Sequence, residues 1–251
     1  SLSWTPANFP PSMTLTSKHS RLAELRPLSP EAVRSVAEAW EVRMIYESNS
    51  IEGNSLTLRE TELVLSKGVT VSGKPLKDHL EAVNLSKAWD RLKQLAGPDA
   101  TFTERDLFDL HGIILGGIDA RGAGRYRDSA VRIAGSNHVP PNPVKVPDLM
   151  EQLFAGAVGV SDPVERAAKL HHGIAAIHPF HDGNGRAARL AMNFVLIAAG
   201  YPPVSISPDL RADYYNALEQ ADAGDFAAWL GFLTTHLDRE LDLWLEALAE
   251  K

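Results

Sequence analysis

Apolar residues recur at helical spacing along most of the chain, and this pattern predicts a protein built mainly of α-helices. The first predicted helix opens at Ser29-Pro30 and carries one apolar face as far as Glu52. A capping box from Thr57 to Glu60 predicts the start of a second helix. The remaining helical patterns cover residues 76–96, 103 onward, 147–158, 163–177, 186–199, 209–222 and 226–249.

Two segments depart from this helical pattern. Residues 1–28 are polar and punctuated by prolines, which predicts an N-terminal arm rather than a folded unit. Residues 124–141 hold a short alternating run that Gly135-Ser136-Asn137 interrupts and two prolines close, which predicts a β-hairpin. We therefore expect a mainly α fold with one small hairpin.

Composition narrows the classes of function. The chain has 251 residues, of which 44% are hydrophobic, and this suffices for one large domain. Its formal charge of −7 argues against a nucleic-acid partner. The chain has no cysteine and forms no disulfide, which is typical of the cytoplasm, where we expect it to act. Its longest apolar stretches are too short and too interrupted to cross a membrane.

The densest group of reactive side chains lies at His178 to Arg189, which reads HPFHDGNGRAAR and directly precedes an apolar helical run. The turn Gly183-Asn184-Gly185 allows backbone N–H groups to face one point at a helix N-terminus, where an anion is favoured. The guanidinium groups of Arg186 and Arg189 suit phosphate oxygens, and Asp182 can hold a divalent cation on those oxygens. These residue types together predict a phosphate-handling site.

Two other interpretations of this stretch are open. Asp-Gly and Asn-Gly are common turn pairs, so the stretch can be an ordinary helix start, although a turn does not require all of these residue types together. A metal site is suggested by four histidines, namely His171, His172, His178 and His181. However, His171 and His172 are adjacent and diverge on a helix, and the chain has no H-E-x-x-H pair. We expect the histidines other than His178 to serve packing and hydrogen bonding.

The stretch resembles the signature of the Fic family, H-P-F-x-D-G-N-G-R-x-x-R, and every fixed position is present. In that family the histidine is a general base that deprotonates a protein hydroxyl, which attacks the α-phosphate of ATP and releases pyrophosphate. The resemblance implies that His178 is the base, that Asp182 binds Mg²⁺ or Mn²⁺, and that Gly183 to Gly185 form the anion hole. It also implies that Arg186 and Arg189 contact the β- and γ-phosphates. The chemistry agrees, because a histidine titrates near neutrality and fixed donors stabilise charge on the phosphate.

A second motif lies upstream at Ser48 to Leu58, which reads SNSIEGNSLTL and contains Ser48, Glu52 and Gly53 in the pattern Ser-x-x-x-Glu-Gly. It resembles the Fic inhibitory motif, in which a helix presents its glutamate to the second arginine of the signature. The resemblance implies that Glu52 pairs with Arg189 and blocks the seat of the γ-phosphate. The other interpretation is a solvated glutamate at a helix end, followed by a capping glycine.

The predicted hairpin corresponds to a flap that covers the active site in Fic proteins. There the target segment pairs with the edge of the flap as an added strand, and the resemblance implies that Val131, Arg132 and Ile133 form this edge. A plain structural hairpin is the alternative. We expect Tyr126 and Arg127 to be packing and surface residues.

The helix predicted over residues 209–222 carries two further candidates, Tyr215 and Asp222. Fic relatives use residues of this helix beside the adenine and the ribose, so the resemblance implies that these two bind the nucleotide. Ordinary helix packing and a solvated carboxylate are the alternatives.

The expected architecture is thus a Fic helical bundle with an arm over residues 1–28, an inhibitory helix region over 29–70 and a catalytic domain over 71–251. The expected function is autoinhibited AMPylation, in which AMP passes from ATP to a Ser, Thr or Tyr hydroxyl of a target protein or of the chain itself. Alternatives are removal of AMP by Glu52, transfer of another nucleotide or of phosphocholine, and a locked nucleotide-sensing module. A homodimer is compatible with this reading.

Overall fold

The computed structural model describes residues 14–25, 30–133 and 136–249. In these residues the chain forms, in order, α1 (Leu15–Glu24), α2 (Pro30–Ile51), α3 (Leu58–Lys67), α4 (Leu76–Leu95), α5 (Glu104–Ile114), the short 3-10 helix η1 (Pro143–Lys145), α6 (Val146–Val158), α7 (Pro163–Ile177), α8 (Asn184–Ala198), the 3-10 helix η2 (Pro208–Leu210), α9 (Arg211–Asp222) and α10 (Phe226–Ala249). The prediction of a mainly helical fold is confirmed.

Helix α8 lies at the centre of the fold. Nearly all of its residues are buried, as expected for a helix with neighbours on every side. Helix α7 packs along it, and α2, α4 and α5 also contact it. Helix α8 begins two residues before the predicted helix start, because Gly183 adopts the left-handed conformation (φ 79°) and caps it. The signature stretch thus occupies the junction between two core helices.

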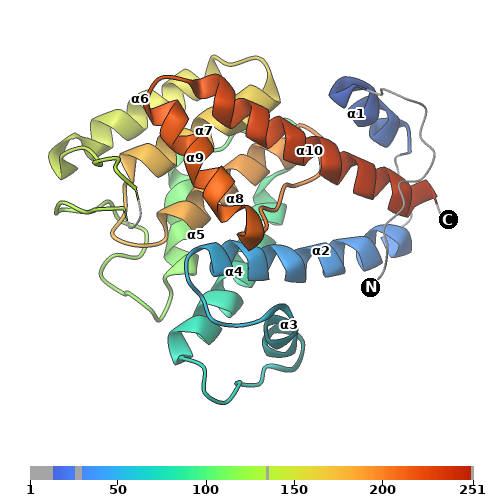
Figure 1. Ribbon diagram of the computed structural model, residues 1–251, viewed down its shortest axis with the longest axis horizontal. Coiled ribbons are helices and arrows are strands. Elements are labelled where there is room, and N and C mark those ends of the chain that lie inside the picture. Colours follow the sequence, from blue (N-terminus) through green and yellow to red (C-terminus); the bar gives the residue numbers. More distant parts are fainter. Residues whose placement is uncertain (1–13, 26–29, 134–135, 250–251) are drawn as a thin grey trace.

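Helix α2 runs along one side of the molecule and contacts α4, α8 and α10 (Figure 1). It buries Trp40, Met44, Ile45 and Ile51 in the common core. The described part of the predicted inhibitory region, residues 30–70, is therefore packed against the rest of the fold, and the last residues of α2 belong to the predicted inhibitory motif.

The prediction that residues 1–28 form only an arm is wrong for residues 15–24, which form α1. Thr14 caps this helix through its side chain, and Leu22 is buried. Lys18 forms ion pairs with Asp238 and Asp242 of α10 at 2.8 and 2.7 Å. The polar composition of this segment gave no sign of a helix, because α1 is held in place by contacts with α10. Residues 1–13 and 26–28 of the predicted arm lie outside the described residues.

The predicted β-hairpin is not observed in the described part of its segment, residues 124–133 and 136–141, which contains no strand. The prolines at 140 and 141 cannot donate to a strand partner. Carbonyl groups that a strand ladder would use instead accept from Arg127, whose nitrogens lie 2.9 Å from the Ser129 oxygen and 2.6 Å from the Pro141 oxygen. Arg127 is buried, so its prediction as a surface residue is wrong. Gly135 lies outside the described residues.

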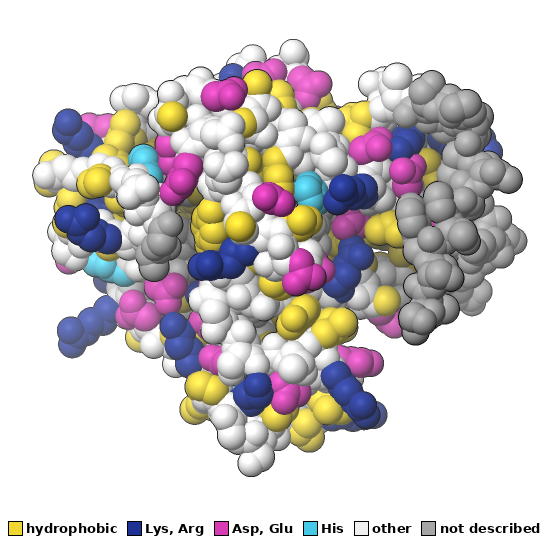
Figure 2. All heavy atoms as spheres, viewed as in Figure 1, with side chains coloured by type: hydrophobic (Ala, Val, Ile, Leu, Met, Phe, Trp, Pro, Cys, Tyr) yellow, Lys and Arg dark blue, Asp and Glu magenta, His cyan; other side chains and the backbone are white. Residues whose placement is uncertain are grey.

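Charged side chains of both signs are interspersed over the face of the molecule that Figure 2 shows. None of the helices in the described ranges combines the length and the apolar character that crossing a membrane requires.

Candidate active site

His178 directly follows α7, where the chain turns into the signature loop. Its backbone is left-handed (φ 52°), a conformation that is costly for residues other than glycine. Its Nδ1 lies 3.2 Å from the Ala175 carbonyl oxygen. Because a carbonyl only accepts, Nδ1 carries the proton and Nε2 keeps its lone pair. Burial lowers the pKa of His178, so the ring is neutral at pH 7 and can accept a proton through Nε2.

Asn184 closes the signature loop with its side chain. Its Oδ1 accepts from the Phe180 N–H at 2.8 Å, and its Nδ2 donates to the Phe180 carbonyl at 2.9 Å. The side chain is thus committed to holding the loop, and Asn184 can contribute to an anion site only through its backbone N–H. The first N–H groups of α8, which begins at this residue, have no partner within the helix.

His111 of α5 contacts the signature loop and holds it in place, a role that the sequence did not indicate. Its Nε2 donates to the Asp182 carbonyl at 2.9 Å, and its Nδ1 accepts from the Gly124 N–H at 3.0 Å. Its ring stacks on Phe180 with the centroids 3.5 Å apart. Burial lowers the pKa of His111 to about 4. A lone histidine in an amphipathic helix carries no local signal of this role, because the role depends on two distant segments.

Asp182, the predicted metal ligand, presents its carboxylate at the edge of the site. Oδ1 accepts from the Gly183 N–H at 2.6 Å, and Oδ2 lies 3.4 Å from Nζ of Lys77. Burial acts to raise the pKa of Asp182, but the Arg186 guanidinium and the Gly183 N–H outweigh it and lower the pKa. The carboxylate is therefore ionised at neutral pH and half exposed. A single carboxylate suits Mg²⁺, which commonly takes one or two carboxylates together with substrate phosphates.

Arg186 is almost fully buried and faces two carboxylates. Nη1 lies 3.1 Å from Glu81 of α4, and Nη2 lies 3.4 Å from Asp182. Asn54, just beyond the predicted inhibitory motif, donates to the same Glu81 at 2.9 Å. Sequence reasoning did not anticipate Glu81, because residues so far apart in the chain become neighbours only through the packing of α4 on α8.

Arg189 is held by the end of α2. Its Nη2 lies 2.8 Å from Oε1 of Glu52 and 2.8 Å from the Ser48 carbonyl, and its Nε donates to Oγ of Ser48 at 2.8 Å. A Cβ atom at Gly185 would lie 2.1 Å from Oε1 of Glu52, so the carboxylate sits directly over the N-terminus of α8. The structure thus brings Ser48 and Glu52 to the second arginine of the signature, and Gly53 takes the positive φ (94°) that ends the helix.

One pocket of about 580 Å³ adjoins these groups. The predicted site residues in its lining are Glu52, Ile133, His178, Gly185, Arg189, Tyr215 and Asp222. Beside it, the predicted flap residue Arg132 is exposed and Val131 is half-buried. The pocket therefore joins the signature loop, the end of α2, the segment before residue 134 and helix α9.

The four histidines considered for a metal site do not gather. His171 is buried against Trp229, with Nε2 2.9 Å from the Tyr214 hydroxyl. His172 pairs with Asp222, and His181 lies 3.3 Å from Asp128. Among the described residues, no three His, Cys, Asp or Glu side chains are arranged so that they could hold a metal ion. The expectation that these side chains serve packing and hydrogen bonding agrees with these contacts.

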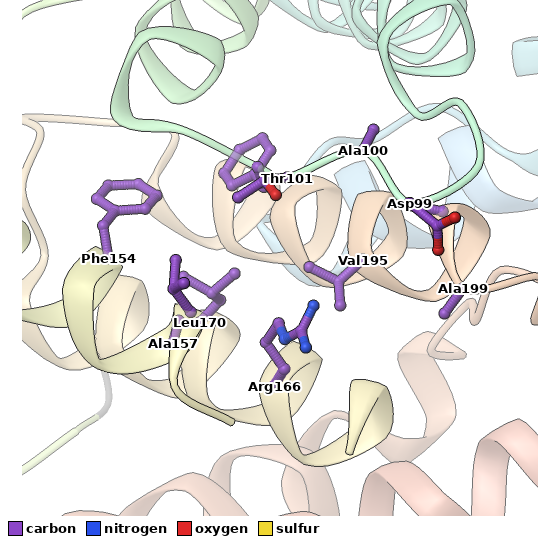
Figure 3. Close-up of a pocket in the computed structure, with 12 residues that line it drawn as sticks. Asp99, Ala100, Thr101, Phe154, Ala157, Arg166, Leu170, Val195 and Ala199 are labelled. Atoms are coloured by element: carbon purple, nitrogen blue, oxygen red, sulfur yellow. The ribbon is translucent and has the colours of Figure 1, made fainter. Parts of the chain in front are cut away.

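Another cavity lies between α6, α7 and α8 (Figure 3). Its lining mixes apolar side chains, such as Phe154, Leu170 and Val195, with the polar side chains of Asp99, Thr101 and Arg166. The guanidinium of Arg166 donates to the Val160 carbonyl at 2.9 and 2.7 Å. Its lining contains no histidine and no glycine, whereas His178 and Gly185 line the pocket beside the signature loop.

Sequence comparisons agree with this geometry. The pattern of the Fic/DOC family matches residues 101–196. The protein adenylyltransferase Fic of Culex quinquefasciatus is 35% identical over 241 residues, which are 94% of this chain and 48% of that protein. The relative of the same name from Aedes aegypti gives the same identity and coverage. The chain thus spans about half the length of the curated relatives it matches.

Solved structures show the same fold. A Fic domain containing signaling protein from Bacteroides thetaiotaomicron superimposes with a TM-score of 0.87 and 31% identity, covering 94% of this chain and 97% of that one. Fic-1 from C. elegans gives a TM-score of 0.81 and 28% identity, covering 94% and 72%. With an intact signature loop on a shared fold over almost its whole length, the chain belongs to the Fic/DOC family.

Proposed function

We propose that this chain transfers AMP from ATP to a hydroxyl group of a protein side chain. One observation carries the proposal. His178 lines the same pocket as Gly185 and Arg189, and because its Nδ1 donates to the Ala175 carbonyl, its Nε2 can accept a proton. The names of the curated relatives, protein adenylyltransferase Fic, support the same activity.

In this reaction the oxygen of a Ser, Thr or Tyr side chain attacks the α-phosphorus. Nε2 of His178 takes the hydroxyl proton, the bond from the α-phosphorus to the bridging oxygen breaks, and pyrophosphate leaves with that electron pair. The N–H groups at the start of α8 stabilise the charge on the phosphate oxygens, and Arg189 binds the terminal phosphates. Mg²⁺ held by Asp182 would supply further neutralisation of the phosphate charge.

The segment Val131 to Ile133 is proposed to receive the target. Residues 131–133 belong to no strand in the described part of the chain, and the Ile133 carbonyl accepts from the Ser136 N–H at 3.3 Å. The backbone groups of Val131 and Arg132 are therefore the ones proposed to pair with an added strand from the target. Such pairing orients a hydroxyl without selecting a sequence, which leaves the choice of target to other surfaces.

We propose that Glu52 restrains this activity. Its carboxylate forms an ion pair with the guanidinium of Arg189 and lies over Gly185, where its negative charge repels an anionic ligand. ATP would then bind with its terminal phosphate displaced from the productive position.

AMP removal is a second candidate. Glu52 lines the same pocket as His178 and is only partly buried, so it can orient a water toward an AMP-modified hydroxyl. A Glu52→Gly protein that keeps full AMP-removing activity would contradict this role.

The proposal is tested with Mg²⁺ and α-labelled ATP on the wild type, Glu52→Gly, and Glu52→Gly/His178→Ala. We expect Glu52→Gly to raise labelling of protein at least about tenfold, because one charged competitor leaves Arg189. Adding His178→Ala should lower the rate by about 10²–10⁴-fold, as loss of a general base does, while ATP binding stays intact. ATP binding without labelling in any variant would refute AMP transfer.

A further inference from the structure

Two buried side chains continue the contacts of Arg189 into the core of the protein. They are Tyr214 of α9 and His171 of α7. Nη1 of Arg189 lies 3.5 Å from the hydroxyl oxygen of Tyr214, and this oxygen lies 2.9 Å from Nε2 of His171. All three residues are at most 5% exposed. The proposed reaction uses Arg189 and gives Tyr214 and His171 no part, although buried polar groups of this kind are costly to keep.

Tyr214 differs from the other partners of Arg189 in its place in the fold. Ser48 lies in α2 and Glu52 directly follows it, and both belong to the predicted inhibitory motif. Among the described residues, Tyr214 is the hydrogen-bond partner of Arg189 that lies outside this motif. When Glu52 leaves, the contact with Tyr214 on α9 is therefore unaffected.

The direction of these hydrogen bonds follows from the chemistry of the groups. A guanidinium only donates, so the oxygen of Tyr214 accepts from Nη1 of Arg189. The hydroxyl hydrogen can then go to Nε2 of His171. Burial, helped by the charge of Arg189, lowers the pKa of His171 well below its ordinary value, so the ring is neutral and has one nitrogen that accepts.

The proton of the neutral His171 ring is located by counting unpaired groups. Nδ1 has no hydrogen-bond partner among the described residues. If Nδ1 carries the proton, it is the one group left unpaired. If Nε2 carries it, both Nδ1 and the hydroxyl hydrogen of Tyr214 are unpaired, and each buried unpaired group is costly. The first form is therefore favoured, and it keeps a lone pair of the Tyr214 oxygen directed at Arg189.

This arrangement matters most when Glu52 is absent. The hydrogen on Nη2 that Glu52 accepts then becomes available to a phosphate oxygen. An arginine side chain has several rotatable bonds, and fixing them costs entropy when a ligand binds. A contact that holds Nη1 beforehand lowers this cost, because the guanidinium already has the orientation that the ligand needs.

We propose that Tyr214, with His171 behind it, is a positioning residue that holds the Arg189 guanidinium in place for the terminal phosphates of ATP after Glu52 has left. The role is one of positioning because the Tyr214 hydroxyl is buried between Arg189 and His171. This inference rests on the proposed function in one respect, namely that Arg189 binds the terminal phosphates.

The test compares ATP with AMP, which lacks the terminal phosphates. Calorimetry with Mg²⁺ measures both affinities for Glu52→Gly/His178→Ala, in which Arg189 is released and turnover is prevented. Tyr214→Phe in this parent keeps the ring and removes the hydroxyl. We expect the affinity for ATP to fall about threefold to tenfold, the usual scale of one hydrogen bond, and the affinity for AMP to stay unchanged.

A double-mutant cycle tests whether Tyr214 acts through Arg189. Arg189→Gln in the same parent should lower the affinity for ATP, and adding Tyr214→Phe should then cause no further loss. His171→Gln, whose amide can accept the hydroxyl hydrogen, should keep the affinity of the parent. His171→Leu cannot accept it and should lower the affinity for ATP alone.

Tyr201→Phe is the matched control. Tyr201 is half-buried, and its ring stacks on His19 with the centroids 3.8 Å apart, away from the lining of the site pocket. Removing its hydroxyl should change neither affinity. Binding of AMP also reports, for each variant, that the pocket is folded. If urea unfolding shows that Tyr214→Phe does not fold, His171→Leu decides by the same comparison.

The outcomes separate this inference from the proposed function. Equal losses of affinity for ATP and AMP, an unchanged affinity for ATP, or a loss that persists in Arg189→Gln would each overturn the inference, even if AMP transfer is observed. A loss confined to ATP that requires Arg189, in a protein that transfers no AMP, would support the inference and refute the proposed function. Failure of the parent to bind ATP would overturn both.

Discussion

Two side chains for which we propose opposite effects, His178 and Glu52, line the pocket beside the signature loop. His178 keeps the lone pair on Nε2 because a backbone carbonyl fixes the proton on Nδ1. Glu52 places a negative charge on Arg189 and over the N-terminus of α8. Substitution of one residue should therefore remove the chemistry, and substitution of the other should release it.

His111 gives an expectation for stability. Its pKa is about 4 in the folded protein, below the ordinary value of 6.5, so between these values the unfolded chain binds a proton that the folded chain excludes. Its contribution is complete above pH 6.5 and falls as the pH drops, by about 3 kcal/mol at 1.36 kcal/mol per unit. We expect the difference in free energy of unfolding between wild type and His111→Gln to shrink by this amount from pH 7.5 to pH 4.

Urea unfolding at several pH values measures this difference. Using the difference between the two proteins removes the contribution of other buried histidines, such as His171, whose pKa burial also lowers. A difference that does not vary with pH would contradict the assignment of a neutral, buried His111.

At the scale of elements, the turn after α2 is tethered to α4. The backbone N–H and Oγ of Ser55 donate to Oδ2 of Asp78 at 2.7 and 2.6 Å, and Asn54 donates to the Asp78 carbonyl at 3.0 Å. These bonds hold the chain directly beyond Glu52. The restraint on Arg189 therefore depends on the position of a turn as well as on a charge.

Asp78→Asn should weaken this tether by about 1–2 kcal/mol, because hydrogen bonds to a carboxylate are stronger than those to a neutral amide. We expect AMP transfer by the otherwise wild-type chain to rise severalfold, measured with α-labelled ATP. The same substitution in Glu52→Gly should cause no further rise. Glu62→Gln, which removes an exposed carboxylate of α3, is the control and should leave the rate of the wild-type chain unchanged.

At the scale of the whole molecule, α2 belongs to the core. Trp40, Met44 and Ile45 are buried against neighbouring helices, and Trp40 also donates to Glu240 of α10 at 3.1 Å. Removing the whole helix would expose this surface, which would cost far more than opening one turn. We therefore expect Glu52 to leave Arg189 through opening of the turn after α2, while the rest of α2 stays packed in the core.

Hydrogen exchange tests this expectation. Backbone amides of residues 40–51 should exchange only through global unfolding, and those of residues 52–55 through local opening that is at least about 100-fold faster. Equal exchange in the two segments would show instead that α2 leaves as a unit. The measurement follows peptides of the intact chain with and without Mg²⁺ and ATP.

The sequence was sufficient to predict helices α2 to α10 and the two motifs. These predictions rest on local patterns, namely helical periodicity, the capping box at Thr57 and the signature stretch, which can be recognised without knowledge of the fold. Predictions from local patterns were wrong where the structure of a segment depends on residues that are distant in the sequence. Helix α1 depends on acids of α10, and the segment after Gly124 gives its carbonyl groups to Arg127 instead of to a second strand.

The site divides in the same way. By itself, the sequence determined the identity and spacing of His178, Asp182, Gly183 to Gly185, Arg189 and Glu52, because their chemistry is written in short motifs.

Only the tertiary structure decided that Glu81 faces Arg186, that His111 supports the loop, and that His138 and His172 flank Asp222. These contacts join residues that lie between 50 and 105 positions apart in the chain. They form only because the elements that carry these residues pack together. Side-chain burial, hydrogen bonds and protonation depend on such neighbours, which no local pattern contains.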